Sequence, residues 1–195
     1  PAMDNTPPML IQTAINFETP GQTIFAEAGT YAEDIIVNKS LSILGPNSAI
    51  NPCSGSRVAE AIVVPATAAI SSGEIFHVAA SNVTISGFTI DGDNASLTSG
   101  YTSTNGADID AAEGITVYET GINGLTATNN IIQNLSYFGV TLYDYPAGVA
   151  SSGHTISNNK IQNMGTYDAG SGIDLWGGGV LLYNNQYAAV TNNCM

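Results

Sequence analysis

The side chains best able to do chemistry in this sequence are carboxylates gathered in residues 91–113. They are Asp91, Asp93, Asp108, Asp110 and Glu113. Carboxylates with amide and carbonyl oxygens nearby can bind Ca²⁺, although this spacing is not that of an EF-hand. Two carboxylates can also act as the acid and base of a glycoside hydrolase. A solvated acidic loop explains the same residues without chemistry, so no cofactor is required and Ca²⁺ is an optional ligand.

Aromatic side chains recur at one place in a repeated phrase and suggest a second kind of site. The phrases Gly114-Ile-Thr-Val-Tyr118, Gly139-Val-Thr-Leu-Tyr143 and Gly179-Val-Leu-Leu-Tyr183 each end in tyrosine. If the phrases are stacked strands, the tyrosines form an external row. The row then packs under a loop or a neighbouring molecule, or offers a platform for sugar rings. A register slipped by one residue would instead bury it. Trp176, in the insertion 164–178, is open to the same glycan or partner roles, or covers the edge of the core.

Basic residues are too few and too far apart for the chemistry they usually support. Lys39 and Arg57 lie near the first strands and Lys160 lies much later in the chain, so we expect that they do not converge on one substrate. His77 and His154 both sit in strand-like phrases and are interpreted as structural. The sequence has no Gly-x-Ser-x-Gly phrase, phosphate loop or Cys/His metal spacing.

Composition restricts the class of partner. Three Lys and Arg residues against 16 Asp and Glu residues give a net charge of −13, and such a surface repels nucleic acid and anionic lipid. It suits cations, neutral glycans or a calcium-rich exterior. No apolar run of about 18 residues is present, so we expect no membrane span. Few lysines and many Asn, Ser, Thr and Gly residues predict a secreted or cell-surface protein.

The elements that must position these residues are short strands, and they predict an all-β solenoid. Strand phrases begin near Thr23 and are bounded by Gly, Pro, Asn or Ser. No helix of useful length separates them, which excludes βαβ folds. Parallel strands without helical crossovers stack as rungs about 4.8 Å apart. Helical spacing appears in residues 10–15, before the first strand.

Four phrases near the N-terminus point to a known architecture. They are Ile11-Gln-Thr-Ala-Ile15, Pro20-Gly-Gln-Thr-Ile24, Gly29-Thr-Tyr31 and Lys39-Ser-Leu-Ser-Ile-Leu-Gly45. Residues 11–45 thereby resemble the opening of right-handed parallel β-helix proteins of the pectate-lyase-like superfamily, and the later Val/Ile-x-Asn-Asn phrases resemble its repeats. The resemblance implies a right-handed parallel β-helix of about five to seven rungs, with a short N-terminal helix that caps the first rung.

The same resemblance does not supply an activity. The superfamily includes lyases, glycosidases, esterases, phage spikes and adhesins, and a shared fold does not fix function. Its polygalacturonase-like members carry Asn-Thr-Asp, Gly-His-Gly and Arg-x-Lys phrases that are missing here. Its pectate-lyase-like members use calcium-binding carboxylates and a basic residue that abstracts a proton, and the three dispersed basic residues do not fit that role.

The chain is expected to form one domain over residues 1–195. Its expected parts are the N-terminal segment and cap (1–22), the first rungs (23–90), the long acidic loop (91–113) and the repeat rungs (114–195), which the insertion 164–178 interrupts. Loops as long as the acidic loop 91–113 are usually functional or disordered.

Paired asparagines close the second phrase of each repeat. Asn130, Asn159 and Asn193 are expected at equivalent turns, with Gly87 in that place one rung earlier. Asn and Gly tolerate left-handed backbone, and stacked amides can bond to one another along a solenoid. We therefore interpret the asparagines as a structural ladder.

The two cysteines are predicted not to pair within one molecule. Cys53 follows the first rung and Cys194 lies on the last, roughly 20 Å apart if four rises of about 4.8 Å intervene. A disulfide needs Cα atoms within about 7 Å. One alternative is a disulfide between Cys53 and Cys194 of successive subunits, and the other is two free or unrelated cysteines. No capping element follows residues 190–193, and an open solenoid end either marks a fragment or invites another subunit.

These observations lead to one expected function and two alternatives. The first is an extracellular or cell-surface structural or adhesive protein that self-associates head to tail into filaments or assemblies. The second is a carbohydrate-active enzyme related to polysaccharide lyases or glycoside hydrolases. The third is a non-catalytic module that binds polysaccharide through Tyr118, Tyr143, Tyr183 and Trp176. The missing catalytic phrases favour the first and argue against an enzyme.

Overall fold

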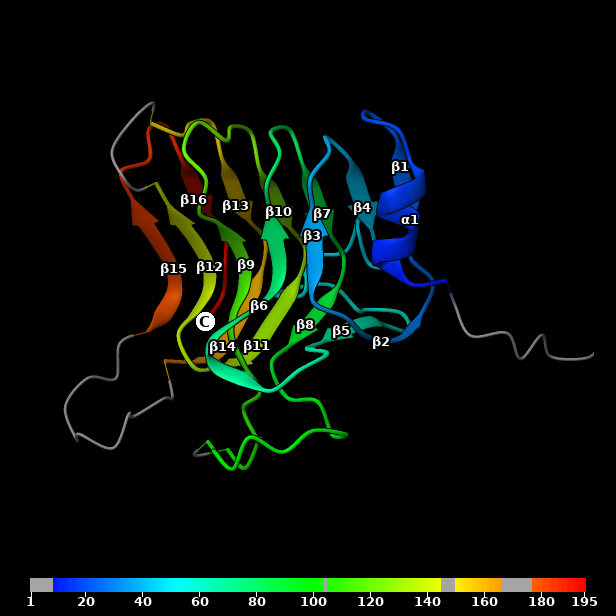
Figure 1. The fold of residues 1–195 in the computed structure, drawn as a ribbon, viewed down its shortest axis with the longest axis vertical. Coiled ribbons are helices and arrows are strands. Elements are labelled where there is room, and N and C mark those ends of the chain that lie inside the picture. Colours follow the sequence, from blue (N-terminus) through cyan, green and yellow to red (C-terminus); the bar gives the residue numbers. More distant parts are fainter. Residues whose placement is uncertain (1–8, 104, 145–149, 166–176) are drawn as a thin grey trace, which may run out of the picture.

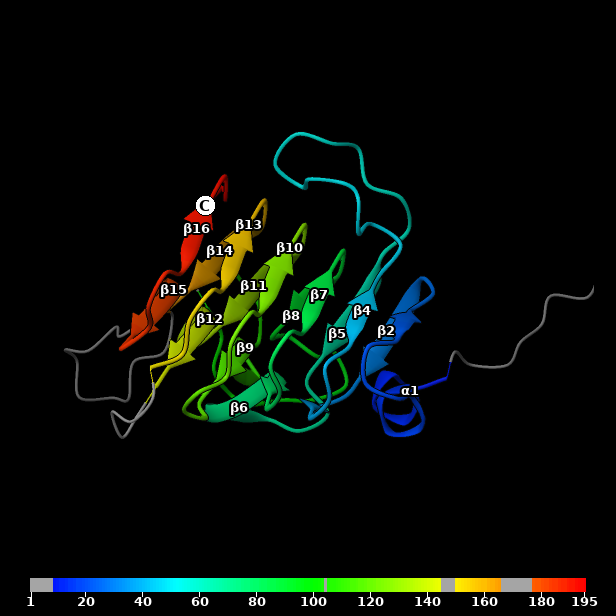
Figure 2. The same ribbon diagram turned by 90° about the horizontal axis from the view of Figure 1, so that it is seen from above.

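The chain coils through three parallel sheets (Figures 1 and 2) in the computed structural model, which describes residues 9–103, 105–144, 150–165 and 177–195. Sheet A consists of β1 (Thr23–Phe25), β4 (Ser42–Leu44), β7 (Thr84–Ser86), β10 (Thr126–Thr128), β13 (Thr155–Ser157) and β16 (Ala189–Thr191). Sheet B consists of β2 (Gly29–Ala32), β5 (Ala61–Val64), β8 (Thr89–Asp91), β11 (Ile131–Leu135) and β14 (Lys160–Met164). Sheet C consists of β3 (Ile35–Val37), β6 (Ala69–Val78), β9 (Ala111–Val117), β12 (Phe138–Tyr143) and β15 (Gly178–Tyr183).

Each strand pairs with the strand three places earlier in the chain, so each turn of the chain adds one strand to each sheet. All strand pairs between neighbouring rungs are parallel, as in β10 against β7 and β12 against β9. The chain is therefore an all-β, β-helix-like solenoid, and the expected stacking of short parallel strands is confirmed at this level.

Apolar side chains of all three sheets fill the interior in rows. One row runs through Ile43, Ile85, Ala127 and Ile156, whose neighbours are in register from β4 to β13, and all four are fully buried. Val140 pairs with Ile115 and both point into the core, as the alternation of the repeated phrase predicts. Each such aliphatic side chain contributes about 1.5–3 kcal/mol by leaving water.

A short helix, α1 (Ile11–Phe17), covers the first rung, with Ile11 and Ile15 buried against it. Both of its ends are capped by the solenoid. The Glu33 carboxylate accepts hydrogen bonds from the backbone N–H groups of Ile11 and Gln12 at 2.8 Å each. Lys39 Nζ donates to the carbonyls of Ile15, Asn16 and Glu18. A helix of seven residues is not stable alone, so these contacts and the apolar face hold it.

Asn130, Asn159 and Asn193 lie one above another and form a continuous amide ladder inside the corner between sheets A and B. Asn159 Oδ1 accepts hydrogen bonds from the backbone N–H and side-chain Nδ2 of Asn130, at 3.0 and 3.2 Å. Asn193 Oδ1 does the same for Asn159, at 2.8 and 3.0 Å. Asn159 Nδ2 also donates to the Ala127 carbonyl. Each rung's turn is thereby tied to the next.

Gly87 belongs to a different column of this corner than its sequence context suggests. Ser86 pairs with Thr128, so Gly87 matches Asn129 and not Asn130, whose place is taken by Phe88. Gly87 and Asn129 both have left-handed backbone, with φ of 82° and 56°. A Cβ at Gly87 would lie 2.1 Å from the backbone nitrogen of Ser48, so a second segment passing over this turn also requires glycine.

That segment is a long loop, residues 45–60 between β4 and β5, which we call the clamp loop. Figure 2 shows it in cyan, extending from β4 toward the later strands. It crosses the turns that follow β7, β10 and β13. Asn129 Nδ2 donates to the Ser48 carbonyl at 2.7 Å, and Asn51 Nδ2 donates to Asn158 Oδ1 at 3.4 Å. The loop therefore runs along the solenoid and does not stay with its own rung.

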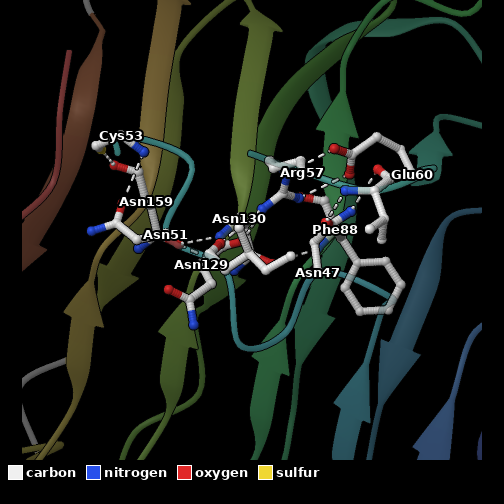
Figure 3. Close-up of polar contacts among 11 residues, drawn as sticks. Asn47, Asn51, Cys53, Arg57, Glu60, Phe88, Asn129, Asn130 and Asn159 are labelled. Atoms are coloured by element: carbon white, nitrogen blue, oxygen red, sulfur yellow. Dashed lines mark hydrogen bonds and ion pairs between the residues drawn. The ribbon is translucent and has the colours of Figure 1, made fainter. Parts of the chain in front are cut away.

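Arg57 fastens the clamp loop to these turns (Figure 3). Its guanidinium donates to the carbonyls of Asn129 and Phe88 at 2.8 and 3.3 Å, and forms a bidentate ion pair with Glu60 at 2.7 and 2.8 Å. The Arg57 side chain is only 9% exposed. A planar donor fork suits several carbonyl and carboxylate acceptors at once, so Arg57 has a structural role.

Cys53 and Cys194 form a disulfide within the molecule, with Cα atoms 5.9 Å apart. The expectation that they do not pair in one chain is therefore wrong, and an intermolecular disulfide between them is contradicted. The axial rise per rung fixes the separation of strands only. A loop that travels along the outside can cross several rungs, and the clamp loop brings Cys53 beside Asn159 and the last turn (Figure 3).

Candidate functional site

The outer face of sheet C brings two glutamates of neighbouring strands together beside the tyrosine row. Glu74 of β6 is the register partner of Glu113 of β9. Together they line a cavity of about 410 Å³, which we call the sheet C groove. Its other lining residues are Ser71, Ser72, Tyr118, Tyr137, Phe138, Tyr143 and Leu181.

Glycine in the repeated phrase explains why Glu113 faces this groove. A Cβ at Gly114 would meet Ile132 Cγ2 at 2.9 Å, inside the core. Position 114 therefore points inward together with Ile115 and shifts the alternation of the strand. Glu113 then lies on the outer face with Thr141 and Tyr118, both of which donate hydrogen bonds to it.

Glu113 is buried, at 5% exposure, and its two hydrogen-bond donors are neutral hydroxyl groups. Thr141 Oγ1 donates to its Oε1 at 2.5 Å, and the Tyr118 hydroxyl donates to its Oε2. Burial raises the pKa of Glu113 above its ordinary value of 4.5; the two hydrogen bonds partly oppose this, and the nearby charge of Glu74 adds to it. Glu113 thus gives up its proton at a higher pH than an ordinary glutamate.

Glu74 lies in a different electrostatic environment because His77 bridges it to Glu119. His77 Nδ1 lies 2.5 Å from Glu74 Oε2, and His77 Nε2 lies 2.7 Å from Glu119 Oε1. The hydrogen bond to Glu74, opposed by burial and aided by Glu119, raises the pKa of His77 to about 9. The imidazole is therefore charged at neutral pH and lies between two carboxylates.

The same contacts act on Glu74 in the opposite sense. Burial by itself would raise its pKa, but hydrogen bonds from His77 and from Thr116 Oγ1, the latter at 2.6 Å, bring it below the ordinary value of 4.5. The pKa values of Glu74 and Glu113 are thus shifted in opposite directions. Two neighbouring carboxyl groups with pKa values pushed apart are a common arrangement for acid–base chemistry.

The tyrosine row is external, but its rings stack on one another. Tyr143 and Tyr183 have ring centroids 4.6 Å apart at an interplanar angle of 22°, and Tyr118 meets Tyr143 edge-on at 6.0 Å. Tyr183 covers one face of the Tyr143 ring, so that ring offers the groove its edge and hydroxyl end. A flat platform along the whole row is not what this geometry provides. Trp176 lies outside the described residues.

The expected calcium ligands do not form one group. Asp91 ends β8 and its carboxylate accepts hydrogen bonds from Gln133 and Asn134. Glu113 lies in the sheet C groove instead. Asp93, Asp108 and Asp110 lie in the segment that projects between β8 and β9 (Figure 1), and burial raises the pKa of Asp93 and of Asp110. The described residues contain no group of three or more His, Cys, Asp or Glu that could hold a metal. Calcium binding by the aspartates stays a prediction.

No Lys or Arg side chain lines the sheet C groove. The chain has three such residues: Lys39 caps α1, Arg57 holds the clamp loop, and Lys160 lies in β14 of sheet B. Neither Lys nor Arg is therefore available in the groove as a proton-abstracting base. His154 is fully buried and accepts a hydrogen bond from the Leu125 N–H at Nδ1, which makes it a neutral structural group.

A second cavity of similar volume, about 420 Å³, lies beside α1 and is lined by Met9, Phe25 and Glu27 among others. Its tyrosine, Tyr31, donates its hydroxyl to the Glu27 carbonyl and is otherwise buried. We assign the candidate site to the sheet C groove, because there two glutamates of neighbouring strands share one cavity with tyrosines.

Glu74, Glu119 and the bridging role of His77 are not identified by the sequence analysis. A signal for the first was present, because Glu74-Ile-Phe-His77 aligns with Glu113-Gly-Ile-Thr116 once β6 and β9 are placed in register. Glu119 follows β9 and reaches back to His77 across the rung, which only the folded chain reveals.

Among the described residues no helix is long and apolar enough to cross a membrane. No protein-family model, no curated protein and no solved structure matches this chain.

Proposed function

We propose that the protein binds an uncharged carbohydrate chain in the sheet C groove, and that it is a secreted or cell-surface β-helix of the pectate-lyase-like kind. One observation carries the proposal: the groove combines aromatic walls with carboxylate acceptors and has no Lys or Arg. Aromatic edges and hydroxyls contact sugar C–H and O–H groups, and carboxylates accept hydrogen bonds from sugar hydroxyls. A volume of about 410 Å³ is in the range of small-ligand sites.

Charge selects among carbohydrates. Glu74 and Glu119 carry negative charge beside the groove, His77 neutralises only one of them, and the whole chain has a net charge of −13. A polyuronate or sulfated glycan would meet like charge and no cation to pair with. Neutral glycans avoid that cost. The disulfide fits an oxidising compartment, which supports the proposed location outside the cell.

Binding should depend on the tyrosine that lines the groove and not on its stacked neighbour. We expect Tyr143→Ala to weaken binding of a neutral oligosaccharide about tenfold or more, because an aromatic contact is worth about 0.5–1.5 kcal/mol beyond its buried area. Tyr183→Ala is the matched control, since Tyr183 belongs to the same row but does not line the cavity. Isothermal titration calorimetry with ligands chosen from a glycan array measures both variants.

The proposal has clear contrary results. Equal losses in the two variants would show that the row acts through folding alone. Preferential binding of polygalacturonate or alginate over neutral chains would contradict the charge argument. Circular dichroism of each variant establishes that the solenoid is intact.

A second candidate function is self-association, and the edge of the last rung favours it. In the described residues β15 and β16 each have a paired neighbour on one side only, whereas β14 also pairs with Cys194. Leu182 and Val190 are 43% and 40% exposed. Unpaired strand edges promote association. Helix α1 covers the opposite end with Ile11 and Ile15, so a head-to-tail contact would have to displace it. Last rung against last rung is the arrangement that needs no such change, and it closes as a dimer.

We expect light scattering at increasing protein concentration to show a monomer–dimer equilibrium that Val190→Lys shifts to monomer. Electron microscopy distinguishes the alternatives: long filaments would favour the head-to-tail form, and a concentration-independent monomer would remove this candidate.

A further inference from the structure

We propose that the sheet C groove hydrolyses glycosidic bonds with retention of configuration, with Glu113 as the general acid and Glu74 as the nucleophile. This inference rests on the proposed carbohydrate binding in the groove, but goes further by assigning a reaction and the groups that perform it. No phrase of the sequence marks it, because the two glutamates come from different rungs.

The spacing of the strands that carry the two glutamates favours retention. Glu74 and Glu113 are register partners on adjacent parallel strands, which lie about 4.8 Å apart. Both line the same cavity. Retaining glycosidases place their two carboxyl groups about 5–5.5 Å apart, whereas inverting enzymes leave about 6.5–9.5 Å for a water molecule. The strand spacing of about 4.8 Å is close to the shorter of these two distances.

The hydrogen bonds leave the correct oxygen atoms for these roles. Both contacts of Glu74 fall on Oε2, from His77 and Thr116, which leaves Oε1 for the substrate. On Glu113, Oε1 contacts the fully buried Thr141 and Oε2 contacts Tyr118, which lines the cavity. Oε2 therefore faces the groove, and when it carries the proton, the hydrogen bond that Tyr118 now donates to it must reverse or give way to the glycosidic oxygen of a bound sugar.

The protonation states agree with this assignment. Burial raises the pKa of Glu113, while His77 and Thr116 outweigh burial at Glu74 and lower its pKa, so between the two pKa values Glu113 is the acid and Glu74 the anion. The other titratable groups that face the pair are His77 and Glu119 on one side and Tyr118, Tyr137 and Tyr143 on the other. Burial and Glu113 raise the pKa of Tyr118, so it stays neutral and serves as a hydrogen-bond donor.

In the first step Glu74 Oε1 attacks the anomeric carbon, and the bond from that carbon to the glycosidic oxygen breaks. The bonding pair leaves with the oxygen, which takes the proton of Glu113. In the second step a water molecule attacks the same carbon, the ester bond breaks with its electron pair returning to Glu74, and Glu113 takes a proton from the water. One water is consumed, nothing is oxidised or reduced, and two inversions give net retention.

His77 is a positioning residue in this scheme. It touches neither substrate nor reacting atom, but fixes Glu74 Oε2 and is itself held by Glu119 at 2.7 Å. Its charge keeps Glu74 ionised at acidic pH. The rate should therefore rise as pH rises through the lowered pKa of Glu74, and fall as pH rises through the raised pKa of Glu113. The two pKa values that limit the rate therefore lie on either side of 4.5, the ordinary pKa of both groups, and the pH optimum lies between them.

The experiment uses the full chain with xylan, mannan, mixed-linkage β-glucan and starch, and measures new reducing ends together with the anomer first released, by NMR. We expect Glu113→Gln and Glu74→Gln to lower kcat about 1,000-fold or more while the affinity for the bound polymer stays within about threefold. Removal of a general acid or nucleophile has effects of this size. An aryl glycoside with an acidic leaving group should restore the first step to Glu113→Gln, seen as a burst of the aryl leaving group, but not to Glu74→Gln.

Two further readouts make the assignment sharper. His77→Gln should move the acidic limb of the kcat/KM profile to higher pH and leave the alkaline limb unchanged, which a purely structural loss would not do. Tyr183→Ala, outside the cavity, should keep wild-type turnover. Binding without any hydrolysis would overturn this inference and leave the binding proposal standing, whereas loss of both would remove the two together. Release of the inverted anomer would overturn the assignment of Glu74 as nucleophile.

Discussion

Replacing Cys53 and Cys194 together by serine is expected to lower the free energy of unfolding by about 2–5 kcal/mol. The disulfide joins positions 141 residues apart, so its removal frees nearly the whole chain in the unfolded state. Loop-closure entropy alone sets an upper value of about 5 kcal/mol for a loop of this length. Chemical denaturation of the oxidised wild type and of the double variant measures the difference.

The location of the damage is a second part of this prediction. Each rung of a solenoid contacts mainly its neighbours, and the disulfide fastens the clamp loop to the last turn. Hydrogen exchange should therefore increase most in β15 and β16 and little in β4 and β7. Arg57 still holds the clamp loop at Asn129 in the variant, so the earlier turns stay covered. Uniform loss of protection, or covalent dimers of wild type on non-reducing gels, would contradict the intramolecular clamp.

Truncation of the central ladder residue, Asn159→Ala, is expected to cost about 3–5 kcal/mol. Its side chain is fully buried and takes part in hydrogen bonds with Asn130, Asn193 and the Ala127 carbonyl. Alanine leaves several of these buried groups without a partner, and each unsatisfied group costs about 1–3 kcal/mol. Thermal and urea unfolding of the variant test the value.

Asn193→Ala is the matched control for the ladder. Asn193 has the same role one rung later, but it is half-buried, so water can replace part of what is lost. We expect a cost of about 1 kcal/mol, near the net value of an ordinary hydrogen bond. If the two variants lose equal stability, or if Asn159→Ala is nearly neutral, the amide column is not a main support of the corner.

What the sequence could predict is what repeats. The phrases ending in Tyr143 and in Asn159 recur because each rung must present the same face to the core and make the same turn, so their spacing reveals parallel stacking. Gly87 shows the limit. Its place in the repeated phrase suggests that it is equivalent to the ladder asparagines, yet its neighbour on the next rung is Asn129. Residue 87 must be glycine because Ser48 of the clamp loop lies where a side chain would be.

Features outside the repeat could not be predicted from the sequence in the same way. The clamp loop has no periodic pattern, so its path along the solenoid was not predictable, and the cysteine pairing followed from that path. The groove depends on a register between β6 and β9 that includes an irregularity between Ala69 and Glu74. Glu113 was recognised as a chemically capable residue but was placed with the aspartates, because its true partner, Glu74, comes from the rung before.

The structure divides the solenoid between two tasks. The corner between sheets A and B contains the asparagine ladder and the clamp loop, and its polar groups form hydrogen bonds that hold the rungs together. The outer face of sheet C instead has a cavity with two carboxyl groups whose pKa values are shifted in opposite directions. Function is therefore best sought on sheet C.

A crystal structure of Glu113→Gln grown with the neutral oligosaccharide that binds best would test the central claim most directly. We expect a sugar chain in the sheet C groove against Tyr118 and Tyr143, with a glycosidic oxygen within hydrogen-bond distance of the residue 113 side chain and the anomeric carbon facing Glu74 Oε1. A chain bound at any other face, with the groove empty, would contradict the assignment of this groove as the functional site.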